Sequence, residues 1–141
     1  MTQAHLDRVL EIENSSFSQP YSREIFEEEL ALDIAHPSIL KVGEILVGFL
    51  DYWLIPQEIH LISIATHPAW RKKGLATFLM EHLEKEANRQ GVGRIFLDVR
   101  KSNIAAIHLY EKFGFKKIGV RRHYYSENNE DALVMEKKFE K

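Results

Sequence analysis

The stretch HPAWRKKGLATFL, residues 67–79, places three consecutive cationic side chains directly before Gly74 and a run of helix-forming residues. A helix N-terminus carries unpaired backbone N–H groups and about half a unit of positive partial charge, so cations at that end do not stabilise the helix. Small residues at Gly74 and Ala76 let a ligand approach this backbone closely. The pattern favours an anionic ligand such as a pyrophosphate. A solvated basic turn with a capping glycine is the alternative, because short glycine patterns are weak signals.

Composition limits the classes of protein that this chain can form. Its 141 residues, 45% of them hydrophobic, fit one domain over 1–141 with an ordinary core. The formal charge of −2 argues against a general nucleic-acid binder. The absence of cysteine excludes disulfides and thiolate ligands, and no metal is expected. Without an apolar run of about 20 residues or a secretory leader, we expect a cytoplasmic protein that does not bind membranes.

Hydrophobic periodicity predicts a single α/β domain with a mixed central sheet flanked by helices. A turn starting at Gly43 is expected to join two strands as a hairpin, and Gly91 is expected to end the long helix. The nearly all-apolar RIFLDV (94–99) predicts a strand buried on both faces. In chain order, the expected elements are a helix over 6–13, a loop over 15–22, a helix capped by Ser22, strands over 38–42, 45–53 and 58–66, a helix over 74–90, a strand over 94–99, a helix over 102–115 capped by Ser102 or Asn103 and ended at Gly114, and strands over 116–125 and 132–139.

Several motifs together resemble one family. RKKGLA (71–76) resembles the Q/R-x-x-G-x-G/A acetyl-CoA motif of the GNAT (GCN5-related N-acetyltransferase) family, and ISIATHPAWRKKGLATFLMEHL (62–83) resembles its strand–turn–helix setting. Within the family, the similarity is greatest to the ribosomal-protein alanine N-acetyltransferases and covers nearly the whole chain. The segments that carry this narrower resemblance are FSQPYS (17–22), LDVRKSNIAAIHLYEKFGF (97–115), RRHYY (121–125) and EDALVM (130–135).

The resemblance implies transfer of acetyl from acetyl-CoA, the co-substrate, to the α-amine of a protein N-terminus, with a ribosomal protein as the candidate partner. An α-amine has a pKa of about 7.7–8.0, so a useful fraction is neutral near pH 7, whereas a lysine amine near 10.4 needs more help. The family usually has a strand before its first helix, and this chain starts at that helix. We therefore expect either a sheet that is one strand short or a start codon upstream.

Asp98 is the first candidate for the catalytic base. It interrupts an apolar strand, and alternation places it on the same face as Phe96 and Arg100. Burial beside apolar neighbours is expected to raise its pKa and make it a better base. The resemblance aligns the family's glutamate with Asp98, which is one methylene shorter, so a bridging water is expected. The alternative is a structural Asp paired with Arg100 or with a backbone N–H.

His60 and Tyr110 are the other catalytic candidates. A histidine is frequent in the corresponding strand of archaeal and eukaryotic N-terminal acetyltransferases, although a lone strand histidine is more often a packed, hydrogen-bonded residue. The resemblance makes Tyr110 the general acid, because a phenol near pKa 10 stays protonated at neutral pH and can donate to the departing thiolate. The alternative for Tyr110 is a core position beside Leu109 and Phe113.

The resemblance also assigns binding residues. Asn103 is a good helix cap on any interpretation, and an oxyanion donor is expected among the backbone N–H groups of strand 58–66, provided that neighbouring strands separate there. Aromatic residues on proline-containing loops suit the clamping of a peptide, or else form a small satellite core. The expected cofactor-binding residues are Ile64, Ala65, Thr66, Arg71, Lys72, Lys73, Gly74, Leu75, Ala76, Thr77 and Asn103, and the expected substrate-binding residues are Phe17, Pro20, Tyr21, Tyr124 and Tyr125.

Two rival functions stay open at this point. The same fold could act on a small-molecule amine or a lysine side chain, although the segments 17–22 and 121–125 argue against that. A non-catalytic acyl-CoA-binding module is the other rival, and the presence of both Asp98 and Tyr110 argues against it. The acidic run Glu27-Glu28-Glu29 is expected to be a solvated helix face.

Overall fold

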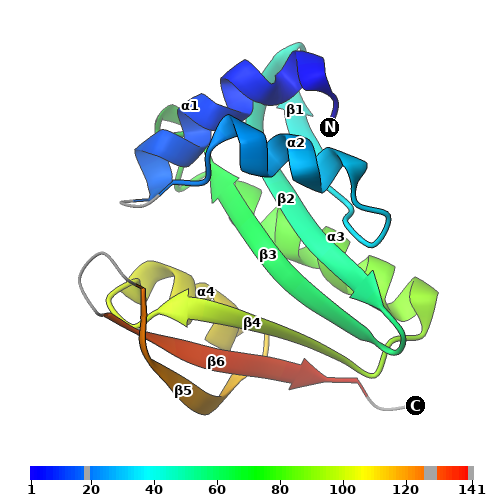
Figure 1. Cartoon of the computed structure of the whole chain (residues 1–141), viewed down its shortest axis with the longest axis vertical. Helices are drawn as coiled ribbons and strands as arrows, with labels where there is room; N and C mark the ends of the chain where they lie inside the picture. Colours follow the sequence, from blue (N-terminus) through cyan, green and yellow to red (C-terminus); the bar gives the residue numbers. More distant parts are fainter. Residues whose placement is uncertain (18–19, 126–129, 140–141) are drawn as a thin grey trace.

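The computed structural model describes residues 1–17, 20–125 and 130–139, without the side chains of residues 123–125. The expected α/β architecture with a mixed sheet is confirmed (Figure 1). The helices are α1 (Leu6–Ser16), α2 (Arg23–Ala31), α3 (Leu75–Gln90) and α4 (Ile104–Lys112), with short 3-10 turns η1 (Gln3–His5) and η2 (Pro68–Trp70). The strands are β1 (Ser38–Val42), β2 (Ile45–Ile55), β3 (Glu58–Thr66), β4 (Arg94–Arg100), β5 (Lys116–Tyr125) and β6 (Glu130–Lys138).

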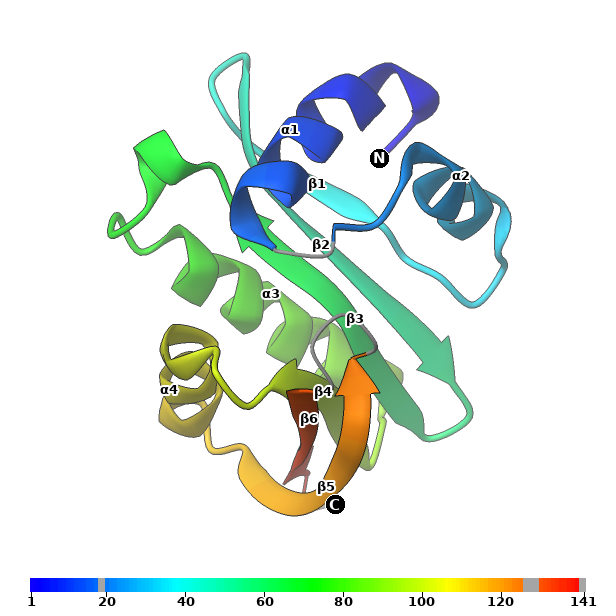
Figure 2. The same ribbon diagram turned by 60° about the vertical axis from the view of Figure 1, so that its left-hand side comes forward.

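The six strands form one sheet in the order β1-β2-β3-β4-β6-β5, in which only β3 and β4 run parallel. Helices α1 and α2 lie on one face of the sheet, and α3 and α4 lie on the other (Figures 1 and 2). In the described residues no strand precedes α1.

The residues predicted to cap a helix, end a helix and form a turn have these roles in the structure. The Ser22 hydroxyl accepts a hydrogen bond from the Ile25 backbone at 3.3 Å and so caps α2. Gly91 ends α3 in the left-handed conformation, and Gly43 opens the β1–β2 hairpin with φ of 61°. Two boundaries differ: α1 continues through Ser16 into the predicted loop, and α4 stops at Lys112 rather than at Gly114.

Two apolar clusters hold the helices on the sheet. Leu6, Val9, Ile12 and Phe26 from α1 and α2 pack against Leu46, Phe49 and Ala65 on one face. On the other face α3 contributes Leu79, Met80, Leu83 and Ala87, which pack against β2, β3, β4 and β6. Each fully buried Leu, Ile or Phe contributes about 1.5–3 kcal/mol relative to exposure, so these clusters fix which sheet face each helix covers.

The two central strands separate halfway along their length. β3 and β4 pair only from Glu58 to Leu61 and from Arg94 to Leu97, and their C-terminal ends diverge (Figure 1). A β-bulge at Ile62 interrupts the β2–β3 ladder at the same level, because Asp51 pairs with Ser63 and Tyr52 pairs with Leu61. The separation that the oxyanion hypothesis required is thus present: β3 beyond Leu61 has β2 on one side and no pairing with β4 on the other.

The prediction that β4 is buried on both faces is wrong. Ile95, Leu97 and Val99 are buried against α3 and α4, whereas the alternate residues Phe96 and Asp98 are only half-buried. The β4 side chains on the α2 face are not sealed by a helix, and this leaves Asp98 accessible from that side.

Glu13 is an acidic residue in the core between α1 and the segment that leads to α2. Its side chain is 2% exposed, Oε2 accepts a hydrogen bond from the Tyr21 backbone at 2.9 Å, and Oε1 has no hydrogen-bond partner in the described structure. Burial raises the pKa of Glu13 to about 7, against the smaller opposite effect of the Tyr21 bond. The protonated form is therefore favoured in the folded chain.

We expect Glu13→Gln to remove part of the pH dependence of stability. Because the folded pKa of about 7 lies above the ordinary 4.5, the stabilisation by Glu13 is fully present below pH 4.5 and is lost as pH rises to 7. This loss amounts to about 3 kcal/mol, and it should be absent in Glu13→Gln, as measured by urea unfolding between pH 4.5 and 8. The exposed Glu44→Gln serves as control. A Glu13→Gln profile that parallels the natural one would contradict the assignment.

Candidate active site

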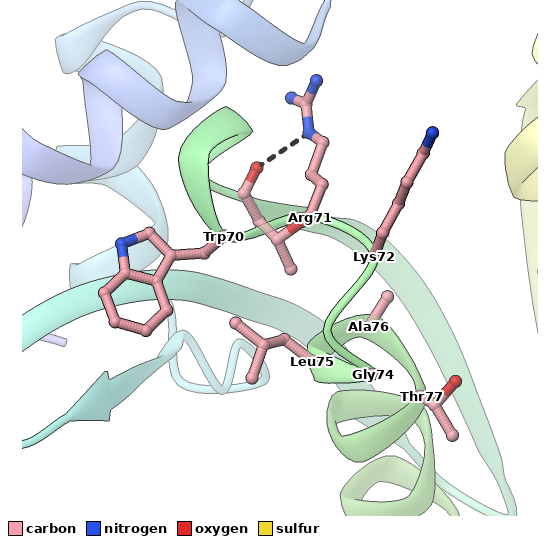
Figure 3. Close-up of a pocket in the computed structure, with 8 residues that line it drawn as sticks. Trp70, Arg71, Lys72, Gly74, Leu75, Ala76 and Thr77 are labelled. Carbon is pink, nitrogen blue, oxygen red and sulfur yellow. Dashed lines mark hydrogen bonds between the residues drawn. The ribbon is translucent and has the colours of Figure 1, made fainter.

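The basic turn between β3 and α3 forms the first cavity, with a volume of about 250 Å³ (Figure 3). Gly74 is the N-cap residue of α3 in the left-handed conformation, with φ of 78°, and Lys72 also has a positive φ of 62°. Left-handed residues are typical of turns whose N–H groups converge on an anion. The cavity thus opens onto the N-terminal end of α3. It is lined by Thr66, Trp70, Arg71, Lys72, Gly74, Leu75, Ala76 and Thr77.

The three predicted cations have different surroundings. Arg71 folds back, so that its Nε donates to the Thr66 carbonyl at 3.3 Å (Figure 3). Its guanidinium also donates to the Ser16 hydroxyl at 2.9 Å. Lys72 lines the cavity, whereas Lys73 is exposed and does not line it. Arg71 therefore braces the turn against α1 and β3, and Trp70 is a cavity residue that the sequence analysis missed.

A second cavity of about 290 Å³ lies on the α2 face of the sheet. His60 and Asp98, the two candidates for the base, both line it. The His60 ring stacks on Phe96 with a centroid distance of 4.4 Å and meets Trp53 edge-on at 5.8 Å. His60 Nε2 lies 3.7 Å from Asp98 Oδ2. The imidazole is thus held between two aromatic rings with one edge toward the carboxylate.

The electrostatics of Asp98 differ from the prediction. Its pKa is lowered, not raised, mainly by the neighbouring His60 and further by Arg121, whose Nε donates to Oδ1 at 2.9 Å; together these two effects outweigh desolvation. The alternative partner Arg100 is also wrong, because Arg100 bonds Glu130 at 3.2 Å. Asp98 is a stable carboxylate, better suited to holding a cationic partner than to taking a proton by itself.

Tyr110 lies on the opposite face of the sheet from Asp98. It is 7% exposed in the cluster under α3 and α4, with its ring 5.9 Å from Phe115. The core position weighed for Tyr110 is therefore real, and a role as acid stays a prediction. On the same helix Asn103 is the cap, because its Oδ1 accepts from the Ala106 backbone at 3.2 Å. This leaves the amide NH₂ of Asn103 available to a ligand.

The predicted substrate residues separate into two groups. Tyr21 lines the second cavity, whereas Pro20 is exposed and does not line it. Phe17 packs against the α1–α2 cluster, as the satellite-core alternative predicted. The side chains of Tyr124 and Tyr125 lie outside the described residues, although their backbone belongs to β5.

Glu29 corrects the expectation of a solvated acidic helix face. It is 8% exposed, lines the second cavity and accepts a hydrogen bond from the Trp53 indole at 2.8 Å. Phe26, three residues earlier in α2, is fully buried, so the i, i+3 spacing was a signal that Glu29 also faces the sheet. Trp53 and Arg121 were missed as well, because only the tertiary structure brings them to Glu29 and Asp98.

The part of β3 that does not pair with β4, residues 62–66, connects the two cavities. Ile62 lines the second cavity, and Thr66, at the other end of the segment, lines the first. Between them Ile64 and Ala65 have β2 on one side only. An extended ligand could lie along this strand edge, with an anionic end at Gly74 and a reactive end beside His60. Among the described residues, no cluster of His, Asp or Glu is arranged to hold a metal ion, and no helix is long and apolar enough to cross a membrane.

Comparisons with known proteins agree with this arrangement. Residues 6–115 match the Acetyltransferase (GNAT) family. The [ribosomal protein bS18]-alanine N-acetyltransferase of Escherichia coli K12 is 33% identical, over 88% of this chain and 84% of that protein. An N-alpha-acetyltransferase of Saccharolobus solfataricus is 34% identical, over 92% and 85%. The crystal structure of the E. coli ribosomal-protein-S18-alanine N-acetyltransferase superposes with a TM-score of 0.91 at 30% identity, covering 100% of this chain and 92% of that one.

A parallel strand pair that opens beside a glycine turn is therefore the frame of an acyl-transferring enzyme. This chain belongs to the Acetyltransferase (GNAT) family.

We expect Gly74→Ala to weaken coenzyme A binding without unfolding the chain. An added Cβ would meet no protein atom within 4 Å, but φ of 78° disfavours alanine by about 1–2 kcal/mol. The methyl group would also obstruct close approach of a phosphate. Calorimetry should show an affinity for coenzyme A that is about tenfold lower.

The matched control is Gly119→Ala, which also adds a methyl group into open space but at a position without positive φ. Equal affinity of Gly74→Ala and the natural chain for coenzyme A would show that the phosphates bind elsewhere.

Proposed function

We propose that this chain transfers acetyl from acetyl-CoA to the α-amine of a protein N-terminus that begins with alanine, and that the acceptor is a ribosomal protein. The observation that carries the proposal is the unpaired edge of β3, which runs from the Gly74 cavity to the His60–Asp98 cavity. The names of the bacterial relatives support the acceptor, and a ribosomal acceptor implies the cytoplasm as the place of action.

The co-substrate is held at two places in this proposal. Its diphosphate binds the N–H groups that open α3 around Gly74, with Lys72 adding positive charge. Its extended arm lies along the free edge of β3 at Ile64 and Ala65, where backbone groups replace the missing β4 ladder. The acetyl group then reaches the gap between β3 and β4, which is open to the second cavity.

The reaction is a direct attack of a neutral amine on the thioester carbonyl. The His60–Asp98 pair takes the proton that the amine loses, and the Asp98 carboxylate stabilises the resulting imidazolium. A backbone N–H of the free β3 edge donates to the oxyanion. As the C–S bond breaks, Tyr110 gives its phenolic proton to the thiolate. One amine proton is lost and one thiol proton is gained, so the step balances.

The acceptor class is tested by mass spectrometry of a peptide library incubated with acetyl-CoA, with fragmentation that separates α-amine from lysine acetylation. We expect modification of the α-amine in peptides that begin with alanine. If small amines or lysine side chains are acetylated while the α-amines of the peptides do not react, the proposed acceptor is wrong. Binding of coenzyme A without transfer to any amine would contradict an enzymatic role.

Tyr110→Phe should lower kcat by about 100-fold or more, because a well-placed general acid contributes this much. Affinity for coenzyme A should stay the same, since the ring and its packing on Phe115 are retained. Stopped-time acetyl transfer and calorimetry measure the two quantities. Tyr52→Phe removes the hydroxyl of another buried tyrosine in the same cluster and is the control. An unchanged kcat in Tyr110→Phe would leave this tyrosine a core residue only.

If His60 and Asp98 act as one base, Asp98→Asn and His60→Gln should each lower kcat/KM by about 100-fold. The double variant should be no slower than the slower single variant, because residues that act as a unit are not additive. Steady-state kinetics between pH 6 and 9 measure this. Full activity of His60→Gln alone would assign the base to Asp98 acting through water, and full activity of both would place the base elsewhere.

A further inference from the structure

The second cavity contains a buried carboxylate that the proposed chemistry does not use. Glu29 projects from α2 into the cavity that His60 and Asp98 also line, and it is held by the Trp53 indole at 2.8 Å. Trp53 in turn meets His60 edge-on, and His60 lies beside Asp98. A chain of contacts therefore runs from Glu29 to Asp98. Glu29 therefore lies in the same cavity as the reacting groups but is separated from Asp98 by two rings.

A second carboxyl group lies behind Glu29. Asp51 on β2 is 1% exposed, and its pKa is raised to about 9 by burial, by its hydrogen bond to Glu29 and by repulsion from Glu29. Two neighbouring carboxyl groups cannot both be charged at little cost, so Asp51, whose pKa is raised, holds a proton. The donor to the Glu29 carboxyl group in the described structure is the Trp53 indole N–H.

In the described part of the chain, the Glu29 carboxyl group has no cationic partner. Asp98 has His60 and Arg121, whereas no Lys, Arg or His side chain in the described part of the chain forms an ion pair with Glu29. No third ligand completes a metal-binding group there among the described residues. A buried carboxylate is costly unless it is paired, and one neutral donor, the Trp53 indole, compensates it only in part.

We propose that Glu29 is a specificity-determining residue that binds a cationic side chain, a lysine ammonium or an arginine guanidinium, of a residue close behind the acetylated N-terminus. This inference rests on the proposed function, since it assumes that a peptide enters this cavity. The α-amine itself is the less suitable cation, because a carboxylate beside it would stabilise the protonated and unreactive form. Tyr21, just before α2, and Ile25 on α2 line the same cavity and supply apolar surface for the aliphatic stem of such a side chain.

The test compares the chain with Glu29→Gln on peptide pairs that begin with alanine and carry either lysine or the uncharged, similarly long norleucine at residue 2 or at residue 3. Gln keeps an oxygen acceptor for the Trp53 indole, so thermal unfolding should change little. Peptide affinity is measured by fluorescence anisotropy with coenzyme A present, and kcat/KM by acetyl transfer. The matched control is Glu28→Gln, which removes the same charge one residue away at an exposed position outside the cavity.

We expect the natural chain to prefer lysine over norleucine at one of the two positions by about tenfold or more, in both affinity and kcat/KM. Glu29→Gln should bring this ratio close to one, and Glu28→Gln should keep it. A ratio that Glu29→Gln leaves unchanged, or no preference in the natural chain, would overturn the proposal. So would equal weakening for both peptides of a pair, which would mean that Glu29 binds the α-amine or only supports the fold.

The two readouts separate this inference from the proposed function. A lysine preference in affinity that depends on Glu29, without any acetyl transfer, would leave the cation site in place and refute the acetylation of peptides. Acetyl transfer that does not depend on the charge at peptide residues 2 and 3 would support the acetylation of peptides and refute the cation site.

Discussion

The early end of pairing between β3 and β4 is the constraint on which the other features of this structure depend. In a sheet interior, the backbone N–H and C=O groups on both edges of a strand are hydrogen-bonded to its neighbours. Here the β3–β4 ladder stops at Leu61 and Leu97, and the bulge at Ile62 interrupts the β2–β3 ladder at the same level. The N–H and C=O groups on the open edge need partners. The unpaired edge of β3 can therefore bind an extended ligand. The same edge runs between the two cavities. It also connects the two faces of the sheet, with Asp98 on one face and Tyr110 on the other.

The divergence is held open by the way in which the helices are anchored. α1 and α2 pack on one face near β2 and the end of β3, whereas α3 and α4 pack on the other face under β3, β4 and β6. Arg71 links these parts, because it bonds both Thr66 at the end of β3 and Ser16 at the end of α1. The basic turn is therefore a structural brace as well as an anion site. Of the three cations, Arg71 thus has a structural role, whereas Lys72 lines the cavity in which an anion is expected.

Electrostatics assign different tasks to the acidic groups near the site. Asp98 is compensated by His60 and Arg121 and stays a carboxylate, while Asp51 and Glu13 are buried and hold protons more tightly than usual. Glu29 is held by a neutral donor, the Trp53 indole. Burial favours the neutral form of an acid, and a nearby cation favours its charged form. Which effect wins is decided by the neighbours that the fold brings to each residue.

The sequence by itself determined most of the elements, the caps at Ser22 and Asn103 and the turn glycines, because these depend on residues a few positions apart. The spacing of Glu29 from Phe26 and the Asp51 in an apolar strand were local signals as well, although their meaning needed the packing. Only the tertiary structure decided where β3 leaves β4, that Arg121 rather than Arg100 partners Asp98, and that Glu29 faces a cavity. Strand divergence, burial and counter-charges arise from groups far apart along the chain, and no local pattern encodes them.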